Sequence, residues 1–305
     1  MSVPMPTAVD DVVDSSTGGR KTGRPDGPFT RSNIVSTIVG GYLPLILATL
    51  VIALPLIWMV LGSLKTPGEI VTTTPRIFPQ DPSLGAYQQV SERISIGRMF
   101  LNSTIVTVVG ASIKVLLAVT TAYALVFVRF PFKRVIFMGI LVALMVPPQV
   151  ALLPNYVLIA GLGGVDTYWG IILPGLGTAF GTFLLRQHFM SLPKEITEAA
   201  EIDGAGHFKR LFRVIVPISG PTIATVALVT IVNEWNDYIW PLIITTQSRM
   251  MTLPVGLTLL RNSEGNAGDY PVLMAGAVLV LLPVLIVFAA LQRFIVAGLT
   301  QGAVK

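Results

Sequence analysis

Residues 32–64, SNIVSTIVGGYLPLILATLVIALPLIWMVLGSL, contain no charged side chain. An α-helix crosses the roughly 30 Å hydrocarbon core of a bilayer with about 20 apolar residues, so this stretch is long enough to span one. Charge-free stretches recur at 135–165, 167–185, 214–233 and 270–292, and residues 99–128 contain one charge, on Lys114. We therefore predict an all-α, polytopic membrane helix bundle. Its six transmembrane helices are expected at 40–64, 99–128, 135–160, 168–186, 214–246 and 270–292.

The composition excludes several classes of protein. Of the 305 residues, 52% are hydrophobic and 12% are charged, whereas a soluble globular chain has about 25% charged residues. This low charge content disfavours a large soluble enzyme, a disordered scaffold and a nucleic-acid-binding domain. The pI of about 9.6 does not favour nucleic-acid binding, because an excess of Lys and Arg in a membrane protein more often marks its cytoplasmic loops. The absence of cysteine excludes disulfides, a thiolate nucleophile and Cys-ligated zinc.

The distribution of Lys and Arg predicts the orientation. Fourteen of them fall in the N-terminal tail, the turn after the second helix, the loop 186–213 and the residues after the sixth helix, against six on the opposite side. The side with fourteen Lys and Arg residues is expected to be cytoplasmic, which places both termini in the cytoplasm. We expect the chain to lie in the cytoplasmic membrane. Residues 1–36 are polar and of mixed charge, so we expect a disordered cytoplasmic tail ahead of a transmembrane domain at 37–305.

Many prolines fall within the predicted helices, and each removes a backbone donor. The carbonyls that lose their donors need partners from neighbouring helices or from a water-lined cavity. Two interpretations remain open: ordinary kinks, or a bundle that changes shape around a pathway. The prolines are Pro44, Pro55, Pro147, Pro148, Pro154, Pro174, Pro221, Pro241 and Pro283.

The loop at 191–217, SLPKEITEAAEIDGAGHFKRLFRVIVP, predicts two short helices separated by a turn. Pro193 suits a first helical turn, and Gly204 supplies the break at its C-terminus. Ile196, Ala199 and Ala200 form a modest apolar stripe, and a second short helix is expected through Phe208, Leu211 and Phe212. This unit is too small to bury its own stripe, so we expect it to dock on the bundle or on a separate soluble protein.

The same loop resembles a known family. Glu198-Ala199-Ala200, then Gly204, then Val214-Ile215-Val216-Pro217 is similar to the EAA signature of permease subunits of binding-protein-dependent ABC importers. Val214 and Val216 stand where that signature has Ile and Leu. The resemblance covers about residues 40–304 and is greatest to the carbohydrate, maltose-permease class. Further similar elements are Arg129-Phe130-Pro131, Leu184-Leu185-Arg186-Gln187 with Phe189, the run from Glu234 to Leu242, and the C-terminal Ala297–Thr300 with Gly302–Lys305.

The resemblance implies a function and partners. It implies a coupling helix that inserts into a groove on an ATPase subunit, with Glu198 facing a basic residue there; the implied coupling residues are Glu198, Ala199, Ala200, Asp203 and Gly204. It also implies a second permease subunit, two ATPase subunits and an extracytoplasmic binding protein. This chain would then hold no cofactor, because ATP and magnesium would bind the ATPase. A self-sufficient secondary transporter is the alternative, although no internal repeat is evident.

Lys114 is the residue expected to have the highest free-energy cost of membrane insertion, because a basic side chain near the bilayer midplane costs about 2.5–3.5 kcal/mol. One interpretation is a structural pair with Glu234 or Asp237. The other is a positive potential in the translocation cavity that favours an anionic or zwitterionic solute. By resemblance the context fits the glycerol-phosphate branch, whose solutes are glycerol-3-phosphate or glycerophosphodiesters such as glycerophosphocholine; a neutral sugar or oligosaccharide remains the alternative.

Other polar and aromatic residues have two interpretations as well. Trp235, Asn236, Tyr238 and Trp240 either sit at the membrane interface, where Trp and Tyr are enriched, or line the cavity. The predicted pathway residues are Lys114, Asn155, Tyr156, Glu234, Trp235 and Asn236, with Gln149 a weaker member.

Signals for an enzyme are absent. The two histidines, His188 and His207, lack carboxylates at ligand spacing. The segment Gly18–Thr22 lacks the ending of a phosphate-binding loop. We therefore expect neither catalysis nor a metal in this chain.

Overall fold

The computed structural model describes residues 38–70, 76–260 and 269–301. These residues form helices and short helical turns, with no strand among them. The predicted N-terminal tail, 1–36, and the last residues of the C-terminal motif lie outside the described residues. The chain divides into two compact units, Met1–Pro55 and Leu56–Lys305, and each is described by itself.

The described part of the first unit is apolar helix. A π-helical turn η1 (Ile38–Tyr42) leads into α2 (Leu43–Ser63), which continues into the second unit. Gly40–Ser63 is apolar and long enough to cross a membrane, as predicted for 40–64. Its side chains are mostly exposed, and Ile52 is 73% exposed. A surface of this kind needs lipid or another membrane helix against it.

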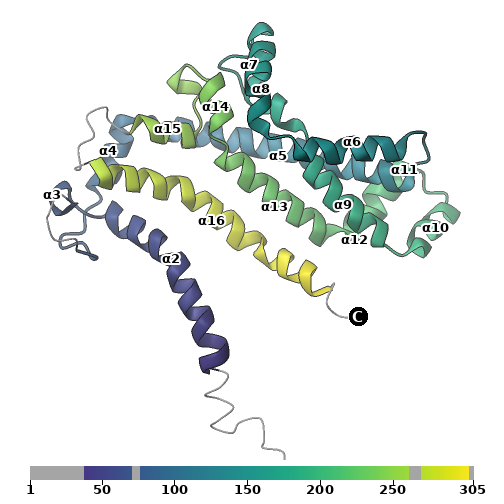
Figure 1. The fold of residues 1–305 in the computed structure, drawn as a ribbon, viewed down its shortest axis with the longest axis horizontal. Coiled ribbons are helices and arrows are strands. Elements are labelled where there is room, and N and C mark those ends of the chain that lie inside the picture. Colours follow the sequence, from purple (N-terminus) through teal and green to yellow (C-terminus); the bar gives the residue numbers. More distant parts are fainter. Residues whose placement is uncertain (1–37, 71–75, 261–268, 302–305) are drawn as a thin grey trace, which may run out of the picture. The chain divides into compact units, whose positions relative to one another are not determined.

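In the second unit, α5 (Ile96–Phe127) is the central element. It packs against α9 (Ala179–Ser191) and α13 (Gly220–Asn236), and α13 also packs against α16 (Tyr270–Gln301) (Figure 1). No proline interrupts the 32 residues of α5. Both α5 and α16 are long and apolar enough to span a bilayer. They lie where the second and sixth spans were predicted, at 99–128 and 270–292, and so confirm those two predictions.

The third, fourth and fifth predicted spans are bent rather than continuous. The third is α6 (Lys133–Met145) followed by η2 (Pro148–Ala151) and α7 (Leu152–Gly161), bent by 93°. The fourth, α8 (Tyr168–Ile172) and η3 (Leu173–Leu176) with α9, bends by 47°. The fifth is α11 (His207–Arg210), η4 (Leu211–Ile215) and α12 (Val216–Ile218), which meet α13 at 84°. Among the described residues there are therefore three unbroken helices long and apolar enough to span a membrane, or up to six spans if each bent pair counts as one.

Prolines lie at or near these breaks. Val146 is extended ahead of Pro147, as the residue before a proline prefers. Besides the bend after Ile218, the single helix predicted over 214–246 is wrong at a second place: α13 ends at Asn236, and α14 (Ile239–Ile244) is separate. The ring of Pro241 would clash with the carbonyl of Asp237 in a continuous helix, and Asp237 is extended, with ψ 123°.

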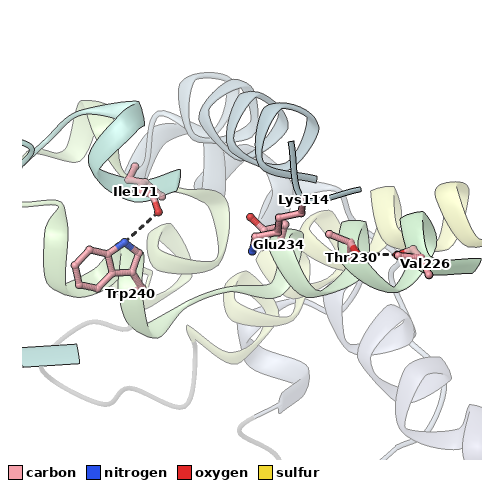
Figure 2. Close-up of polar contacts among 6 residues, drawn as sticks. All are labelled: Lys114, Ile171, Val226, Thr230, Glu234 and Trp240. Carbon is pink, nitrogen blue, oxygen red and sulfur yellow. Dashed lines mark hydrogen bonds and ion pairs between the residues drawn. The ribbon is translucent and has the colours of Figure 1, made fainter. Parts of the chain in front are cut away.

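Trp240 compensates for one of these prolines. Pro174 has no N–H, so the carbonyl of Gly170, four residues earlier, lacks its helical donor. Trp240 Nε1 donates to Gly170 O at 3.2 Å and to Ile171 O at 3.0 Å. Figure 2 shows the second of these bonds. Both bonds are buried. The indole therefore satisfies a backbone group that lipid could not, and it fixes α14 to α8.

Buried polar contacts hold the loops at one end of α5. Those loops carry α3 (Pro67–Ile70), α4 (Gly85–Arg93), η5 (Ser248–Met250) and α15 (Leu253–Leu259). Asn102, fully buried, donates through Nδ2 to the carbonyls of Arg249 and Met251, both at 2.9 Å, and accepts from Tyr168 Oη at 2.8 Å. Sequence reasoning missed this residue, because nothing local distinguishes it from other polar residues on an apolar helix.

Asp166 connects two loops by hydrogen bonds. Burial opposes its ionisation, but the hydroxyl of Thr246 and the backbone N–H groups of Gln247 and Thr246 donate to the carboxylate. These bonds lower the pKa of Asp166 below its ordinary value of 3.8. The hydrogen bonds of Asp166 therefore join the turn after α7 to the segment after α14.

Replacing Trp240 with Phe should leave the Gly170 carbonyl unsatisfied and cost about 1–3 kcal/mol of stability, besides the packing lost with the smaller ring. In a Pro174→Ala background the restored N–H can serve Gly170, so the same replacement should cost about 1 kcal/mol less. Chemical unfolding in mixed micelles, followed by circular dichroism, measures both. An equal loss in the two backgrounds would contradict the compensation.

Candidate functional site: the loop 191–217 and an ion pair between two helices

The loop after α9 contains a short helix with a well-defined end. This helix, α10 (Lys194–Ile202), begins directly after Pro193, which is its N-cap rather than a residue of the first turn as predicted, so the predicted start is correct to within one residue. Gly204 has φ +67°; its N–H bonds to Glu201 O at 3.0 Å, and that of Ala205 to Ala200 O at 2.9 Å. This pair of bonds is a Schellman motif, which favours glycine at the left-handed position. A Cβ on Gly204 would meet no atom within 4 Å. Within this chain, therefore, glycine is favoured at position 204 by the left-handed backbone conformation and not by lack of space.

The loop exposes one set of side chains and buries another. Glu198, Ala199, Asp203 and Gly204 are exposed, whereas Ala200 packs inward, 7% exposed. The predicted apolar stripe of Ile196, Ala199 and Ala200 is therefore not buried as a whole. Ile196 is partly buried and Ala200 is buried, whereas Ala199 is exposed.

Two large apolar residues of the loop are also exposed. Ile202 is 87% exposed and Phe208 is 81% exposed. Leu211, which belongs with Phe208 to the predicted second short helix, is buried instead. Sequence reasoning did not single out Ile202; its place between Glu201 and Asp203, off the apolar stripe, is the signal that could have found it.

Three contacts fix the loop to the bundle. Arg210 is buried and forms an ion pair with Glu201. Tyr123, near the end of α5, lies with its hydroxyl 3.1 Å from His207 Nδ1. Leu211 and Ile215 join an apolar cluster with residues of α5 and α9. The loop is therefore in contact with the end of α5 through a polar contact and an apolar cluster.

In the middle of α5, Lys114 forms an ion pair with Glu234 of α13. Their side chains point toward one another between the two helices (Figure 2), with exposures of 15% and 13%. The interpretation that pairs Lys114 with Glu234 is therefore confirmed in geometry. A buried pair of this kind costs much less than either charge alone, because each compensates the desolvation of the other.

The pair has room because two neighbouring residues lack side chains. A Cβ on Gly110, one turn before Lys114, would lie 2.6 Å from Glu234 Oε2, and one on Gly175 would lie 3.2 Å from Lys114 Nζ. Beside the pair is a cavity of about 120 Å³, whose lining includes Thr178, Thr230 and Asn233. Lys114 therefore pairs with a carboxylate and also borders a small cavity whose lining is partly polar.

A larger groove is unsuited to a charged solute. It has a volume of about 1040 Å³ and lies between α5, α13 and α16, with an almost wholly apolar lining. Trp235 borders it, but the residue is otherwise buried: its Nε1 donates to Val280 O at 2.9 Å, and its ring meets Phe100 edge-on. This placement favours packing for Trp235; a role in the pathway stays a prediction.

The remaining predicted pathway residues are dispersed. Asn236 is exposed, and its amide donates to Val232 O at 2.8 Å, one turn back. Asn155 and Tyr156 are half-buried on α7, away from the ion pair, with Tyr156 against an apolar cluster. Gln149 is exposed. Within the described residues, no group of three His, Asp or Glu could hold a metal ion.

Removing one partner of the ion pair should destabilise the protein. Lys114→Met leaves Glu234 buried without a counter-charge, so we expect a loss of about 3–5 kcal/mol, and Glu234→Met should behave alike. The double variant Lys114→Met/Glu234→Met should recover most of this loss. Unfolding in mixed micelles gives the coupling energy, and additive single losses would argue against a compensating pair.

Comparison with known proteins agrees with this geometry. The family model described as binding-protein-dependent transport system inner membrane component matches residues 114–301. The chain is 33% identical over 274 residues to the sn-glycerol-3-phosphate transport system permease protein UgpE of Brucella suis, covering 88% of this chain and 97% of that protein. It is 36% identical over 206 residues to the arabinooligosaccharides transport system permease protein AraQ of Halalkalibacterium halodurans, covering 68% and 73%.

A solved structure is also similar. The crystal structure of a bacterial ABC transporter involved in the import of the acidic polysaccharide alginate matches with a TM-score of 0.75 and 26% identity, covering 88% of this chain and 99% of that chain. The family model spans more than half of the chain and includes Lys114, Glu234 and the whole loop 191–217. The chain therefore belongs to the inner membrane components of binding-protein-dependent transport systems, the permease subunits of ABC importers.

Proposed function

We propose that this chain forms one half of the translocation pathway of an ATP-driven importer for glycerol-3-phosphate or a glycerophosphodiester. The other half is a second, different permease subunit. Two ATPase subunits bind ATP and magnesium and drive the cycle, and an extracytoplasmic binding protein delivers the solute. Family membership favours this role over a secondary transporter.

The observation that carries the proposal is the exposed surface of the coupling loop. A helix of nine residues, fixed by its own Schellman motif and by Arg210, presents Glu198, Asp203 and Ile202 outward. Large apolar side chains beside carboxylates, on a rigid support outside the spans, have the character of a protein–protein contact. The ATPase subunit is the partner that this surface fits.

The contacts of the loop suggest how closure of the ATPase pair reaches the pathway. Pulling α10 moves His207 and Arg210, and Tyr123 passes that displacement to α5. Since α5 is continuous from Ile96 to Phe127, Lys114 moves with it relative to its partner Glu234. The cavity beside the pair then changes shape as the bundle rocks.

The substrate proposal rests on Lys114 and on the relatives. A lysine bordering a polar cavity in the interior of a membrane bundle is a natural partner for a phosphate. The permease from Brucella suis and that from Agrobacterium fabrum, 33% identical over 267 residues, both belong to sn-glycerol-3-phosphate transport systems by name.

A neutral sugar or oligosaccharide is the second candidate. Glu234 already neutralises Lys114, so the pair presents no net charge to a solute while it remains intact. The relative from an arabinooligosaccharide transport system is consistent with such a solute.

Glu198→Lys should abolish uptake without reducing insertion in the membrane, because it inverts the charge that faces the ATPase. Glu195→Lys is the matched control, since it makes the same change one turn earlier on the exposed part of α10. Uptake of labelled solute and co-purification of the ATPase are measured together. Intact uptake and co-purification in Glu198→Lys would overturn the coupling role.

Lys114→Ala should reduce uptake of glycerol-3-phosphate about ten- to a hundredfold, as expected for losing one charge-assisted hydrogen bond, and uptake of a neutral sugar much less. The variant Lys114→Ala/Glu234→Ala removes the buried carboxylate too, so it separates solute recognition from stability. Equal losses for both solutes in both variants would assign the pair a structural role alone.

A further inference from the structure

Four cations gather where α5 ends, α6 begins and α9 packs against α6: Arg129, Lys133, Arg134 and Arg186. None of them forms an ion pair within the part of the chain that the structure describes. Between Arg93 and Lys194 the sequence has one carboxylate, Asp166, and it is engaged with Thr246 and Gln247. The corner therefore has a strong positive charge without a counter-charge from its own helices.

Arg186 is held in a fixed orientation there. Its guanidinium carbon lies 3.9 Å from the ring centroid of Phe137, and that ring stacks on Phe183 with an interplanar angle of 11°. Stacking on an aromatic face leaves the N–H edge of a guanidinium available for a planar anion. Arg186 Nε is buried and has no hydrogen-bond partner, and such a donor is costly when it stays unsatisfied.

Lys133 adds a second fixed charge beside Arg186. Its ammonium donates to the carbonyls of Val126 at 2.9 Å and Val128 at 3.2 Å, which leaves one of its three donors available. The charges of Lys133 and Arg186 repel one another. Two cations held close by their own contacts are favourable only with an anion between or beside them.

The surface next to this corner indicates where the anion comes from. Val135, Ile136 and Met138 on the first turns of α6 are exposed, as side chains that face hydrocarbon are. An anion at the edge of this face lies at the level where phospholipid phosphates meet acyl chains.

We propose that Lys133 and Arg186 bind the phosphate of an anionic membrane phospholipid, with its acyl chains along Val135, Ile136 and Met138 of α6 and with Arg129 and Arg134 adding attraction for the headgroup. Arg186 donates through its planar N–H edge, and Lys133 through its remaining N–H. Free phosphate offers the same oxygens but none of the apolar contacts.

Native mass spectrometry of the full-length chain, in neutral detergent and with its co-purifying subunits, tests this proposal. The chain is titrated with phosphatidylglycerol, phosphatidylcholine or inorganic phosphate. Arg186→Gln and Lys133→Gln should each weaken phosphatidylglycerol binding about tenfold or more, the loss expected for one charge-assisted bond. Arg98→Gln removes the same charge from an exposed position at the other end of α5 and should leave it unchanged.

Arg186→Lys keeps the charge but not the planar fork, so it should bind phosphatidylglycerol with intermediate affinity and guards against a misfolded Gln variant. Equal effects of Arg186→Gln and Arg98→Gln would mean that net charge alone attracts the lipid, and would overturn the site. Displacement of the lipid by millimolar inorganic phosphate, or equal binding of phosphatidylcholine, would do the same.

Discussion

Every backbone N–H and C=O inside the hydrocarbon layer must find a partner within the protein, and this obligation governs the structure. Prolines lie at or near the breaks in three of the predicted spans, and a proline leaves the carbonyl four residues earlier without its helical donor. Trp240 reaches from α14 to the carbonyl that Pro174 leaves without a donor. The hydroxyls of Thr225 and Thr245 add bonds to the carbonyls of Pro221 and Pro241, although the carbonyl of Pro241 already accepts from the backbone N–H of Thr245. At Pro174, therefore, a side chain from another helix supplies the missing donor, and the bent segment depends on its packing against α14.

The unbroken α5 is the counterpart of these bends. Along its length it carries three polar residues that each contact a different part of the protein: Asn102 holds the loops at one end, Lys114 pairs with α13, and Tyr123 meets the coupling loop. A helix without proline transmits displacement along its axis, whereas the bent spans can change their angle. This division gives a physical basis for coupling a loop outside the spans to a cavity within them.

Much of the fold followed from sequence, because burial in lipid leaves a direct trace in charge-free runs of about 20 residues. The six segments, the start of α10 and the role of Gly204 as its end were all predictable. The break after Asn236 was not, since Asp237 and Tyr238 are compatible with helix and the proline that forbids it lies downstream. The site was predictable in part: Lys114 and Glu234 are conspicuous as charges, but Trp235 and Asn155 were grouped with them by residue type, and the fold separates them.

The sequence by itself determined that this chain lies in a membrane, that it carries a short helix in the loop 191–217, and that a lysine lies near the middle of a predicted span. These are local properties, set by side-chain hydropathy and by the conformational limits of glycine and proline. The tertiary structure decided which of two carboxylates meets Lys114, which carbonyl accepts Trp240, and that Arg186 stacks on Phe137 beside Lys133. Such pairings join residues that are 49 to 120 positions apart and lie on different helices, so they depend on how bent helices pack rather than on any short pattern in the chain.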